Sequence, residues 1–527
     1  MEKVYPIDIN GINNMGVEEW LENYYVPVTG KEFKNIYDNV FKSYMDIIKE
    51  HDNRIIYWIA ISNVRIPHYV SLYILDLLRF VRLKEKGYEY IIGKNKEGVP
   101  GSTSTVHSSF SKNKGLVIED IAGIAFQRRA KEILSTIKHN IKPLSLHGVS
   151  FAKNISNLCY IVGNRYLKEV VSFCDESNIA PVYLSPMLFA KKGNNHYGGN
   201  FKTSGLIEFV NKFLDIVRNQ YAVINNTVFE CLQKEINEML RLSYLFFCHN
   251  VKVFSKFKPK RLLLTSLGNP IHRIFSSAWR YAGGEVVGLS HGNTYSNHYS
   301  DRIFIELSAV DVFVSTSRGH KEIVRQAVDN FAPDFRNCKI ISSKNNIYKP
   351  LFGRLQSDPP VNKIKKIMVI GNIIDSYVAF DTECHTFARL YHQIEIVKLL
   401  KDSGFYVIYK PRFEMLTEIK GIFEAYADEV IIDRFEDVYH SADCLLFSAP
   451  YSTTFGFSLL TNKPIVLINI KGNPWYPRAF ELVKERCAVV KAETVDGKIV
   501  FNEQDVLNAI QESINNINYD ILHEFAF

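Results

Sequence analysis

Residues Leu446–Leu460 read Leu-Phe-Ser-Ala-Pro-Tyr-Ser-Thr-Thr-Phe-Gly-Phe-Ser-Leu-Leu. The apolar run in this stretch ends at Ser448, Pro450 marks a turn, and hydroxyl residues follow where a helix would begin. A buried strand that turns directly into a helix is the building unit of an α/β protein with a parallel sheet. The stretch therefore predicts one strand–turn–helix unit, with polar residues at the carboxyl end of its strand.

Similar units are predicted along the rest of the chain, because short apolar runs alternate with helical patterns. In the C-terminal part we expect strands at Ile367–Ile370, Tyr406–Tyr409, Val430–Ile432, Cys444–Phe447, Pro464–Ile468 and Ala488–Val490. In the N-terminal part we expect strands at Arg54–Ser62, Leu158–Gly163, Pro181–Ser185, Arg261–Ser266, Glu285–Ser290 and Val310–Ser315. Helical spacing predicts one or two long helices within Gly205–Val253, and shorter helices at His392–Lys401 and Ile419–Tyr426.

The strand-rich parts are separated by a segment that predicts a domain boundary. Ser342–Lys366 contains Pro350, Gly353, Pro359, Pro360 and several lysines, and it has no apolar periodicity. A chain of 527 residues is also too long for one ordinary core. We therefore expect two Rossmann-like domains, at residues 1–345 (with helical insertions) and 366–527, joined by a linker at 346–365. The sheets are expected to face each other across a cleft.

The composition is typical of a globular enzyme, with 46% hydrophobic and 23% charged residues. The net charge of +7 suits either a mixed solvated surface or an anionic ligand, but it is too small to favour nucleic-acid binding. The N-terminus lacks the pattern of a signal peptide, and the apolar run Tyr69–Val81 is interrupted by Asp76 and Arg79. Eight cysteines without a C-x-x-C pair indicate reduced thiols, so we expect a cytoplasmic protein.

Three hydroxyl residues, Ser452, Thr453 and Thr454, follow Tyr451 at the predicted helix start. The free N–H groups of a first helical turn, together with hydroxyls, make a site for a phosphate or a carboxylate. The plain alternative is that these residues only cap the helix. We predict that Tyr451 and the three hydroxyl residues belong to a donor-binding site.

Further candidate ligand contacts stand at the ends of two other C-terminal strands. Lys410 and Arg412 bracket Pro411, which restricts the backbone between the two cations. Lysine supplies a point charge and arginine a fork that matches phosphate or carboxylate, although a solvated strand end would look the same. Gly371 and Asn372 follow the first strand of the C-terminal domain, where small residues suit a nucleotide-binding loop.

The N-terminal part offers acid–base candidates. His291 and Gly292 follow the predicted strand Glu285–Ser290, and we expect them to contact the donor. Glu119 and Asp120 follow a short apolar run and are the first candidates for a general base, with His147 next. Each of these also has a purely structural interpretation. No D-x-D, P-loop, H-E-x-x-H or zinc spacing occurs, so we expect neither a metal nor a cofactor.

Taken together, parts of the sequence resemble bacterial surface-polysaccharide transferases over roughly residues 261–470. The resemblance lies in His291-Gly292, Glu306, Ala309–Val314, the stretch Ser448–Thr454, and the Leu459–Val466 segment with its Asn462-Lys463-Pro464 turn. The families are capsule Kdo transferases, polysialyltransferase-like and other nonulosonic acid transferases, and CDP-glycerol polymer transferases. Several of them carry His-Pro where this chain has Lys410-Pro411-Arg412.

The resemblance implies a GT-B fold and an inverting, metal-independent glycosyltransferase with the nucleotide mainly on the second domain. It implies a CMP-linked acidic sugar (Kdo or a nonulosonic acid) as donor and a glycan or lipid-linked acceptor. The basic-aromatic run Lys252–Arg261 suits peripheral contact with an anionic inner membrane face, or is a solvated turn. Alternatives are a CDP-glycerol-type phosphotransferase, a nucleotide-sugar epimerase, and an inactive assembly subunit.

Overall fold

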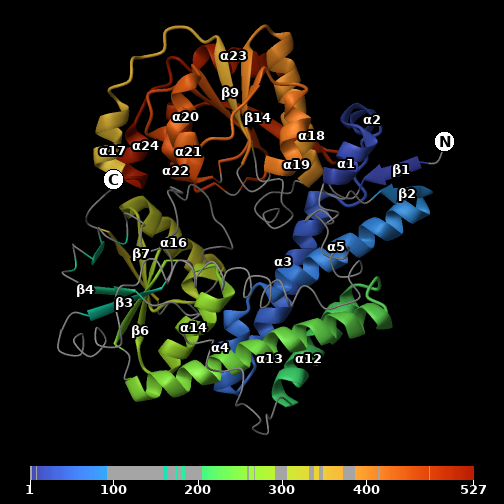
Figure 1. Cartoon of the computed structure of the whole chain (residues 1–527), viewed down its shortest axis with the longest axis vertical. Helices are drawn as coiled ribbons and strands as arrows, with labels where there is room; N and C mark the ends of the chain where they lie inside the picture. Colours follow the sequence, from blue (N-terminus) through green and yellow to red (C-terminus); the bar gives the residue numbers. More distant parts are fainter. Residues whose placement is uncertain are drawn as a thin grey trace, which may run out of the picture.

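The computed structural model describes most of the chain. The described residues are 3–6, 9–91, 158–162, 170, 173–174, 177, 180–183, 204–257, 260–265, 267–290, 305–331, 338–343, 348–371, 386–412, 416–450, 452–473 and 475–527. They form two α/β domains stacked one above the other, with a layer of helices beside the first (Figure 1).

The first domain is built on a parallel sheet in the order β4-β3-β5-β6-β7-β8. Its strands are β3 (Leu158–Val162), β4 (Ala180–Tyr183), β5 (Arg261–Leu264), β6 (Glu285–Leu289), β7 (Val312–Ser315) and β8 (Lys339–Ser342). Helix α14 (Pro270–Tyr281) joins β5 to β6, and α16 (Arg318–Phe331) lies between β7 and β8. The inner strands β5, β6 and β7 are mostly buried, as expected for a parallel sheet covered on both faces.

The second domain is built on a sheet in the order β11-β10-β9-β12-β13-β14-β15, in which only β15 is antiparallel to its neighbour among the described pairs. Its strands are β9 (Lys366–Ile370), β10 (Tyr406–Lys410), β11 (Glu429–Val430), β12 (Cys444–Phe447), β13 (Ile465–Ile470), β14 (Ala488–Val495) and β15 (Lys498–Phe501). Its helices are α18 (Thr386–Asp402), α19 (Leu416–Glu424), α20 (Phe435–Val438), α21 (Thr453–Leu459), α22 (Pro477–Arg486) and α23 (Glu503–Glu512).

The order β11-β10-β9-β12-β13-β14 is that of a doubly wound, Rossmann-like sheet. The predicted α/β class, with two Rossmann-like domains of the GT-B type, is therefore confirmed. The predicted linker region 346–365 contains a short helix, α17 (Tyr348–Leu355), before the chain enters β9.

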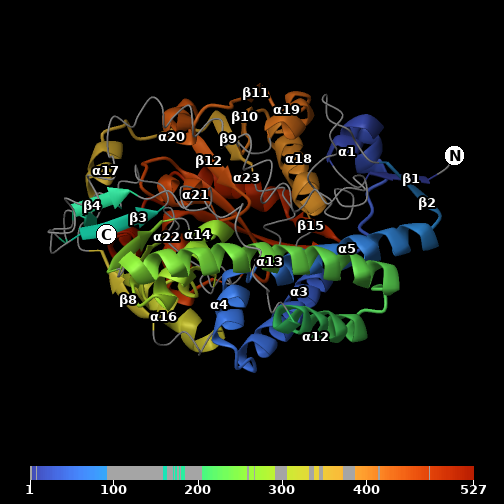
Figure 2. The same ribbon diagram turned by 60° about the horizontal axis from the view of Figure 1, so that its bottom comes forward.

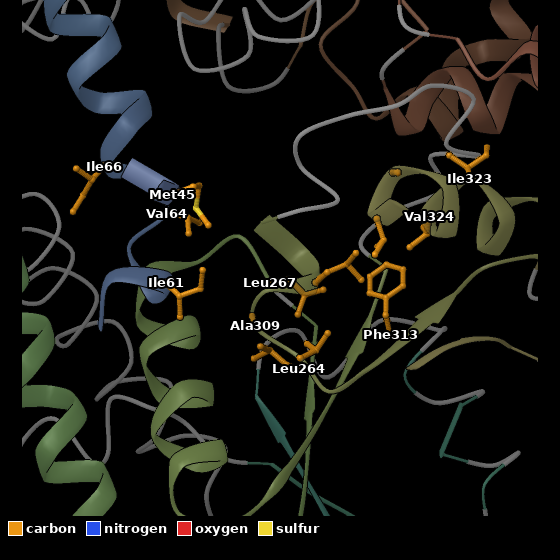
Figure 3. Close-up of a cluster of buried hydrophobic side chains, with 14 of the residues drawn as sticks. Met45, Ile61, Val64, Ile66, Leu264, Leu267, Ala309, Phe313, Ile323 and Val324 are labelled. Carbon is orange, nitrogen blue, oxygen red and sulfur yellow. The ribbon is translucent and has the colours of Figure 1, made fainter. Parts of the chain in front are cut away.

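The helical layer beside the first sheet consists of α3 (Gly30–Lys49), α4 (Arg54–Ser62), α5 (Ile66–Glu85), α12 (Ser204–Gln220) and α13 (Asn226–Phe257). Helix α13 runs across this domain with α12, α3 and α4 beside it (Figure 2). The long helices expected within Gly205–Val253 are thus confirmed as α12 and α13. A cluster of buried side chains joins this layer to the sheet, with Met45, Ile61 and Val64 on one side and Leu264 and Phe313 on the other (Figure 3).

The strand predicted at Arg54–Ser62 is wrong, because this segment is helix α4. The side chain of Asn53 caps the helix by accepting hydrogen bonds from the N–H groups of Ile55 and Ile56, at 3.0 and 3.3 Å. The helix packs against α13 and α14 and buries Ile56, Ile59, Ala60 and Ile61. A nearly continuous apolar run of this length has no periodicity that separates a buried strand from a buried helix.

The first elements of the chain lie against the second domain rather than the first (Figure 1). We call this part the N-terminal arm: β1 (Lys3–Pro6), α1 (Ile9–Met15), α2 (Val17–Glu22) and the turn to Tyr25. Trp20 meets the rings of Phe387 and Tyr391 in α18, with centroids 5.9 and 6.2 Å away. Strand β1 pairs with β2 (Tyr88–Ile91), which follows α5, so the arm is also tied to the helical layer.

The C-terminal helix α24 (Asp520–Phe525) makes the converse crossing and packs on α16 of the first domain. The Ser317 hydroxyl donates a 2.6 Å hydrogen bond to the Phe525 carbonyl. A Cβ atom on Gly319 would lie 2.5 Å from the Phe525 ring, so the close approach of the two helices requires glycine there. The N-terminal arm therefore packs on the second domain, and the C-terminal helix packs on the first.

Across the described residues, no helix combines the length and the apolar character needed to cross a bilayer.

Candidate functional site

The carboxyl edge of the second sheet brings together residues that follow three adjacent strands. The chain goes from β9 to β10 on one side and later returns to β12 on the other side of β9. Ligands of open α/β sheets bind at such a switch point, beyond the carboxyl ends of the strands. Gly371 follows β9, Lys410 ends β10, and Ser448 follows β12. The Gly371 N–H donates to the Lys410 carbonyl at 2.9 Å, so two of the predicted site residues are direct neighbours.

Lys410 is a buried cation at this edge. Its side chain is only 7% exposed, and its Nζ donates to the Pro411 carbonyl at 2.9 Å. Burial lowers the pKa of the Lys410 ammonium, while the nearby carboxylates of Glu436 and Asp433 oppose that shift. An ammonium has three donors, of which the described residues accept one. Arg412, two residues on, is half-buried.

The hydroxyl residues after β12 divide into a cap and two outward groups. Ser452 is the N-cap of α21, and its hydroxyl accepts a 3.1 Å hydrogen bond from the Phe455 N–H. Thr453 is exposed and Thr454 half-exposed. The N–H groups of these two threonines are the first of the helix and have no acceptor within it. The capping interpretation thus describes Ser452, while the two threonines present hydroxyls in the first turn.

Arg486 supports the turn that follows α21, a role that the sequence did not reveal. Its side chain is fully buried and donates to the carbonyls of Leu459, Thr461 and Lys463, at 3.2, 2.5 and 3.1 Å. The turn Asn462-Lys463-Pro464 lies at the amino edge of the sheet, since it leads into β13. There Lys463 Nζ donates to the Ala442 carbonyl at 2.7 Å. No local pattern marks Arg486, because its partners lie more than a helix away in the sequence.

The first sheet carries a buried arginine between its helices. Arg273 in α14 is 1% exposed and donates to the carbonyls of Ile61 and Ser62, at 2.6 and 3.0 Å, and to the Ser308 hydroxyl at 2.6 Å. Burial lowers the pKa of Arg273 to about 9. These contacts fix α4 and residues near 308 against α14, which is a structural role.

Several predicted site residues lie outside the described residues, and their assignment stays a prediction. They are Glu119, Asp120, His147, His291, Gly292, Asn372 and Tyr451. Of the donor-binding prediction, the structure therefore describes Gly371, Lys410, Arg412, and Ser452 to Thr454. Within the part of the chain that the structure describes, no three His, Cys, Asp or Glu side chains gather in a way that could hold a metal ion.

Comparison with known proteins gives no family for this chain. No protein-family model matches it, and no curated protein matches it. The solved structures that match include a UDP-N-acetylglucosamine 2-epimerase from Rickettsia bellii, at 14% identity and a TM-score of 0.33, over 69% of this chain and 89% of that one. Similarity at this level does not indicate a function for this chain.

Proposed function

We propose that the protein is an inverting glycosyltransferase that takes an acidic sugar, Kdo or a nonulosonic acid, from a CMP donor. The donor binds at the carboxyl edge of the second sheet. The observation that carries the proposal is that Gly371, Lys410 and Ser448 stand at the ends of adjacent strands at the switch point of a doubly wound sheet, with α21 beginning shortly after Ser448. The resemblance of the sequence to surface-polysaccharide transferases supplies the donor class and the choice of reaction.

The charge pattern of this edge suits a donor that carries both a phosphate and a carboxylate. Lys410 and Arg412 offer cations of different shape, and the N–H groups of Thr453 and Thr454 offer neutral donors. A buried ammonium such as that of Lys410 interacts more strongly with an anion than an exposed one, because less water screens it. The pairing of an ammonium with a helix start is how proteins commonly stabilise a departing phosphate.

In the proposed reaction, the acceptor hydroxyl forms a bond to the anomeric carbon while the bond from that carbon to the CMP phosphate oxygen breaks. A general base takes the acceptor proton, and Glu119, Asp120 and His147 remain its candidates. The phosphate leaves with the bonding electron pair, and Lys410, Arg412 and the α21 N–H groups stabilise its charge. The acceptor is proposed to be a glycan or a lipid-linked glycan. The basic run Lys252–Arg261 would contact the anionic membrane surface that carries a lipid-linked acceptor.

A thermal-shift panel of CMP, CDP, UDP and GDP tests the nucleotide directly. A ligand that binds only the folded protein raises its stability by RT ln(1 + [L]/Kd), which is about 2.7 kcal/mol at 100 times Kd. We expect CMP to give the largest shift. A protein that none of the four nucleotides stabilises would contradict the proposal and favour an inactive assembly subunit.

Product analysis separates the remaining alternatives. With a CMP-linked acidic sugar and a glycan acceptor, we expect the acceptor to gain the mass of the sugar alone. An acceptor that gains a phosphopolyol from CDP-glycerol would identify a phosphotransferase. A nucleotide sugar that epimerises without any acceptor would identify an epimerase.

A further inference from the structure

Tyr409 and Gln393 form a buried polar pair directly beneath the candidate site. Tyr409 lies in β10 and Gln393 in α18, and both side chains are fully buried. The Tyr409 hydroxyl donates to the Gln393 side-chain oxygen at 2.7 Å. The Tyr409 ring also stacks on Phe423 at a centroid distance of 3.5 Å. A phenylalanine ring could stack on Phe423 in the same way, so the contribution specific to the Tyr409 hydroxyl is its hydrogen bond to Gln393.

The Tyr409 hydroxyl fills the place where a side chain of residue 371 would lie. A Cβ atom on Gly371 would be 2.8 Å from the Tyr409 hydroxyl oxygen, closer than such atoms approach each other. The same Cβ would be 3.0 Å from the Lys410 carbonyl oxygen and 3.2 Å from the Pro411 Cα. The side-chain direction of Gly371 thus points into the protein, against the phenol and the end of β10.

We propose that Tyr409 is a positioning residue for the nucleotide site: its hydroxyl, held by Gln393, fixes the Gly371 backbone against the end of β10. The Gly371 N–H already donates to the Lys410 carbonyl at 2.9 Å, so the same contact places Gly371 relative to Lys410. The pair therefore sets the separation of two strand ends between which the proposed donor binds. This role rests on the function proposed above, but the contact itself is testable without any ligand.

The Tyr409 hydroxyl oxygen is the nearest of the three atoms that crowd a side chain at position 371, and this gives the test. Gly371→Ala, Tyr409→Phe, the double variant and the wild type form a double-mutant cycle, measured by urea unfolding. We expect Gly371→Ala to lower the free energy of unfolding of the wild-type protein. The same substitution should lower it markedly less in the Tyr409→Phe variant, because the hydroxyl oxygen nearest the added Cβ is absent there. Equal costs in the two backgrounds would overturn the proposed contact, whether or not a nucleotide binds.

Nucleotide affinity separates positioning from ordinary stabilisation. The probe is CMP, titrated by calorimetry into wild type, Tyr409→Phe, Gln393→Leu and Tyr439→Phe. Tyr439 is the matched control. Its hydroxyl also donates a 2.7 Å hydrogen bond, to Asp358, but Tyr439 precedes β12 and so lies at the amino edge of the sheet, opposite the candidate site. We expect Tyr409→Phe and Gln393→Leu to weaken CMP binding by roughly 3- to 10-fold, which is about 0.7 to 1.4 kcal/mol, while Tyr439→Phe leaves it unchanged.

Two results of this titration are decisive. If Tyr409→Phe and Tyr439→Phe bind CMP equally well, the positioning role is overturned. If the wild type binds no CMP, the proposed donor is wrong, and the unfolding cycle alone decides whether Tyr409 holds Gly371 in place.

Discussion

Lys410 combines two properties that are costly together, a charge and burial. The side chain is almost inaccessible, and the described partner of its ammonium is a carbonyl rather than a carboxylate. An ionised group in such a place is destabilising unless it is compensated, and groups of this kind concentrate at functional sites. Lys463 is buried to a similar extent, but its ammonium donates hydrogen bonds to backbone carbonyls at the opposite edge of the same sheet. The two lysines therefore allow burial and site position to be separated by experiment.

We expect Lys410→Ala and Arg412→Ala each to reduce donor use at least tenfold, about 1.4 kcal/mol, because each removes a charge that stabilises the leaving phosphate. Steady-state rates with a CMP-linked sugar measure this. Lys463→Ala is the control and is expected to keep its donor kinetics even if it lowers stability. Wild-type rates in both site variants would refute the assignment of the donor site.

Two buried histidines predict how stability depends on pH. Burial lowers the pKa of His392 to about 3 and that of His320 to about 4. Because the unfolded chain, with pKa values near 6.5, binds protons that the folded protein does not, stability falls as pH drops below about 6.5. For one such histidine the loss between pH 7 and pH 5 is about 2 kcal/mol.

His392→Leu isolates one of these contributions. In the part of the chain that the structure describes, neither ring nitrogen of His392 has a hydrogen-bond partner, and the ring lies against Phe501. We expect urea unfolding of His392→Leu to show stability at pH 7 close to that of wild type and a smaller loss at pH 5. If His392→Leu loses as much stability between pH 7 and pH 5 as the wild type does, His392 is not held neutral in the folded protein.

At the residue scale, the sequence predicts neighbours that a strand pairing brings together, but not partners from distant elements. Gly371 and Lys410 were both expected at strand ends, and parallel pairing of β9 with β10 places them side by side. The partners of Tyr409 and Arg486 come from other elements, namely α18 and the turn after α21. Such contacts depend on the packing of helix on sheet, which no local pattern encodes.

At the scale of elements, helix α4 shows where periodicity fails as a guide. Its residues Ile55–Ser62 are almost all apolar, since the helix is enclosed by α13 and α14. Helix α18 (Thr386–Asp402) differs from α4 in this respect, since it contains the helix predicted at His392–Lys401 and confirms it. By contrast, the strands of both sheets were largely predictable, because short β-rich runs separated by helices have few other interpretations.

The capping of α4 predicts the effect of one substitution. We expect Asn53→Ala to destabilise the protein by about 1 kcal/mol, since two N–H groups lose their shared acceptor. Asn508→Ala, on the exposed face of α23, is the control and is expected to stay within about 0.5 kcal/mol of wild type. Urea unfolding measures both, and equal effects would show that the Asn53 cap is unimportant.

At the scale of the whole molecule, the two domains are joined by more than the linker. The N-terminal arm lies along α18, where Glu18 accepts a 2.6 Å hydrogen bond from Tyr426 and pairs with Lys398 at 3.2 Å. The C-terminal helix α24 reaches back to α16. One cluster of buried apolar residues also includes members of both domains, such as Phe313 and Leu445. Nothing in the sequence pattern indicates these crossings, because an arm and a tail show only local helical spacing.

We expect Trp20→Ala to release the N-terminal arm at a cost of about 3–5 kcal/mol, the usual cost of truncating a buried tryptophan. Hydrogen exchange should then rise in the arm and α18, with little change in β5 and β6. Trp279→Ala is the matched control, since Trp279 is fully buried within the first domain against Phe254 and Phe275. If Trp20→Ala also raises hydrogen exchange in the first domain, the substitution destabilises the whole protein rather than releasing the arm alone.

The docking of the arm on α18 has a consequence for how the protein is made. Ribosomes synthesise chains from the N-terminus, and domains generally fold as they emerge. The arm is therefore translated before the first sheet, and α18, which packs on Trp20, is translated only after that sheet. During that interval Trp20 and Ile12 lack the apolar residues of the second domain with which they are buried in the folded protein. A second domain expressed without the arm would leave the outer face of α18 uncovered and prone to aggregate.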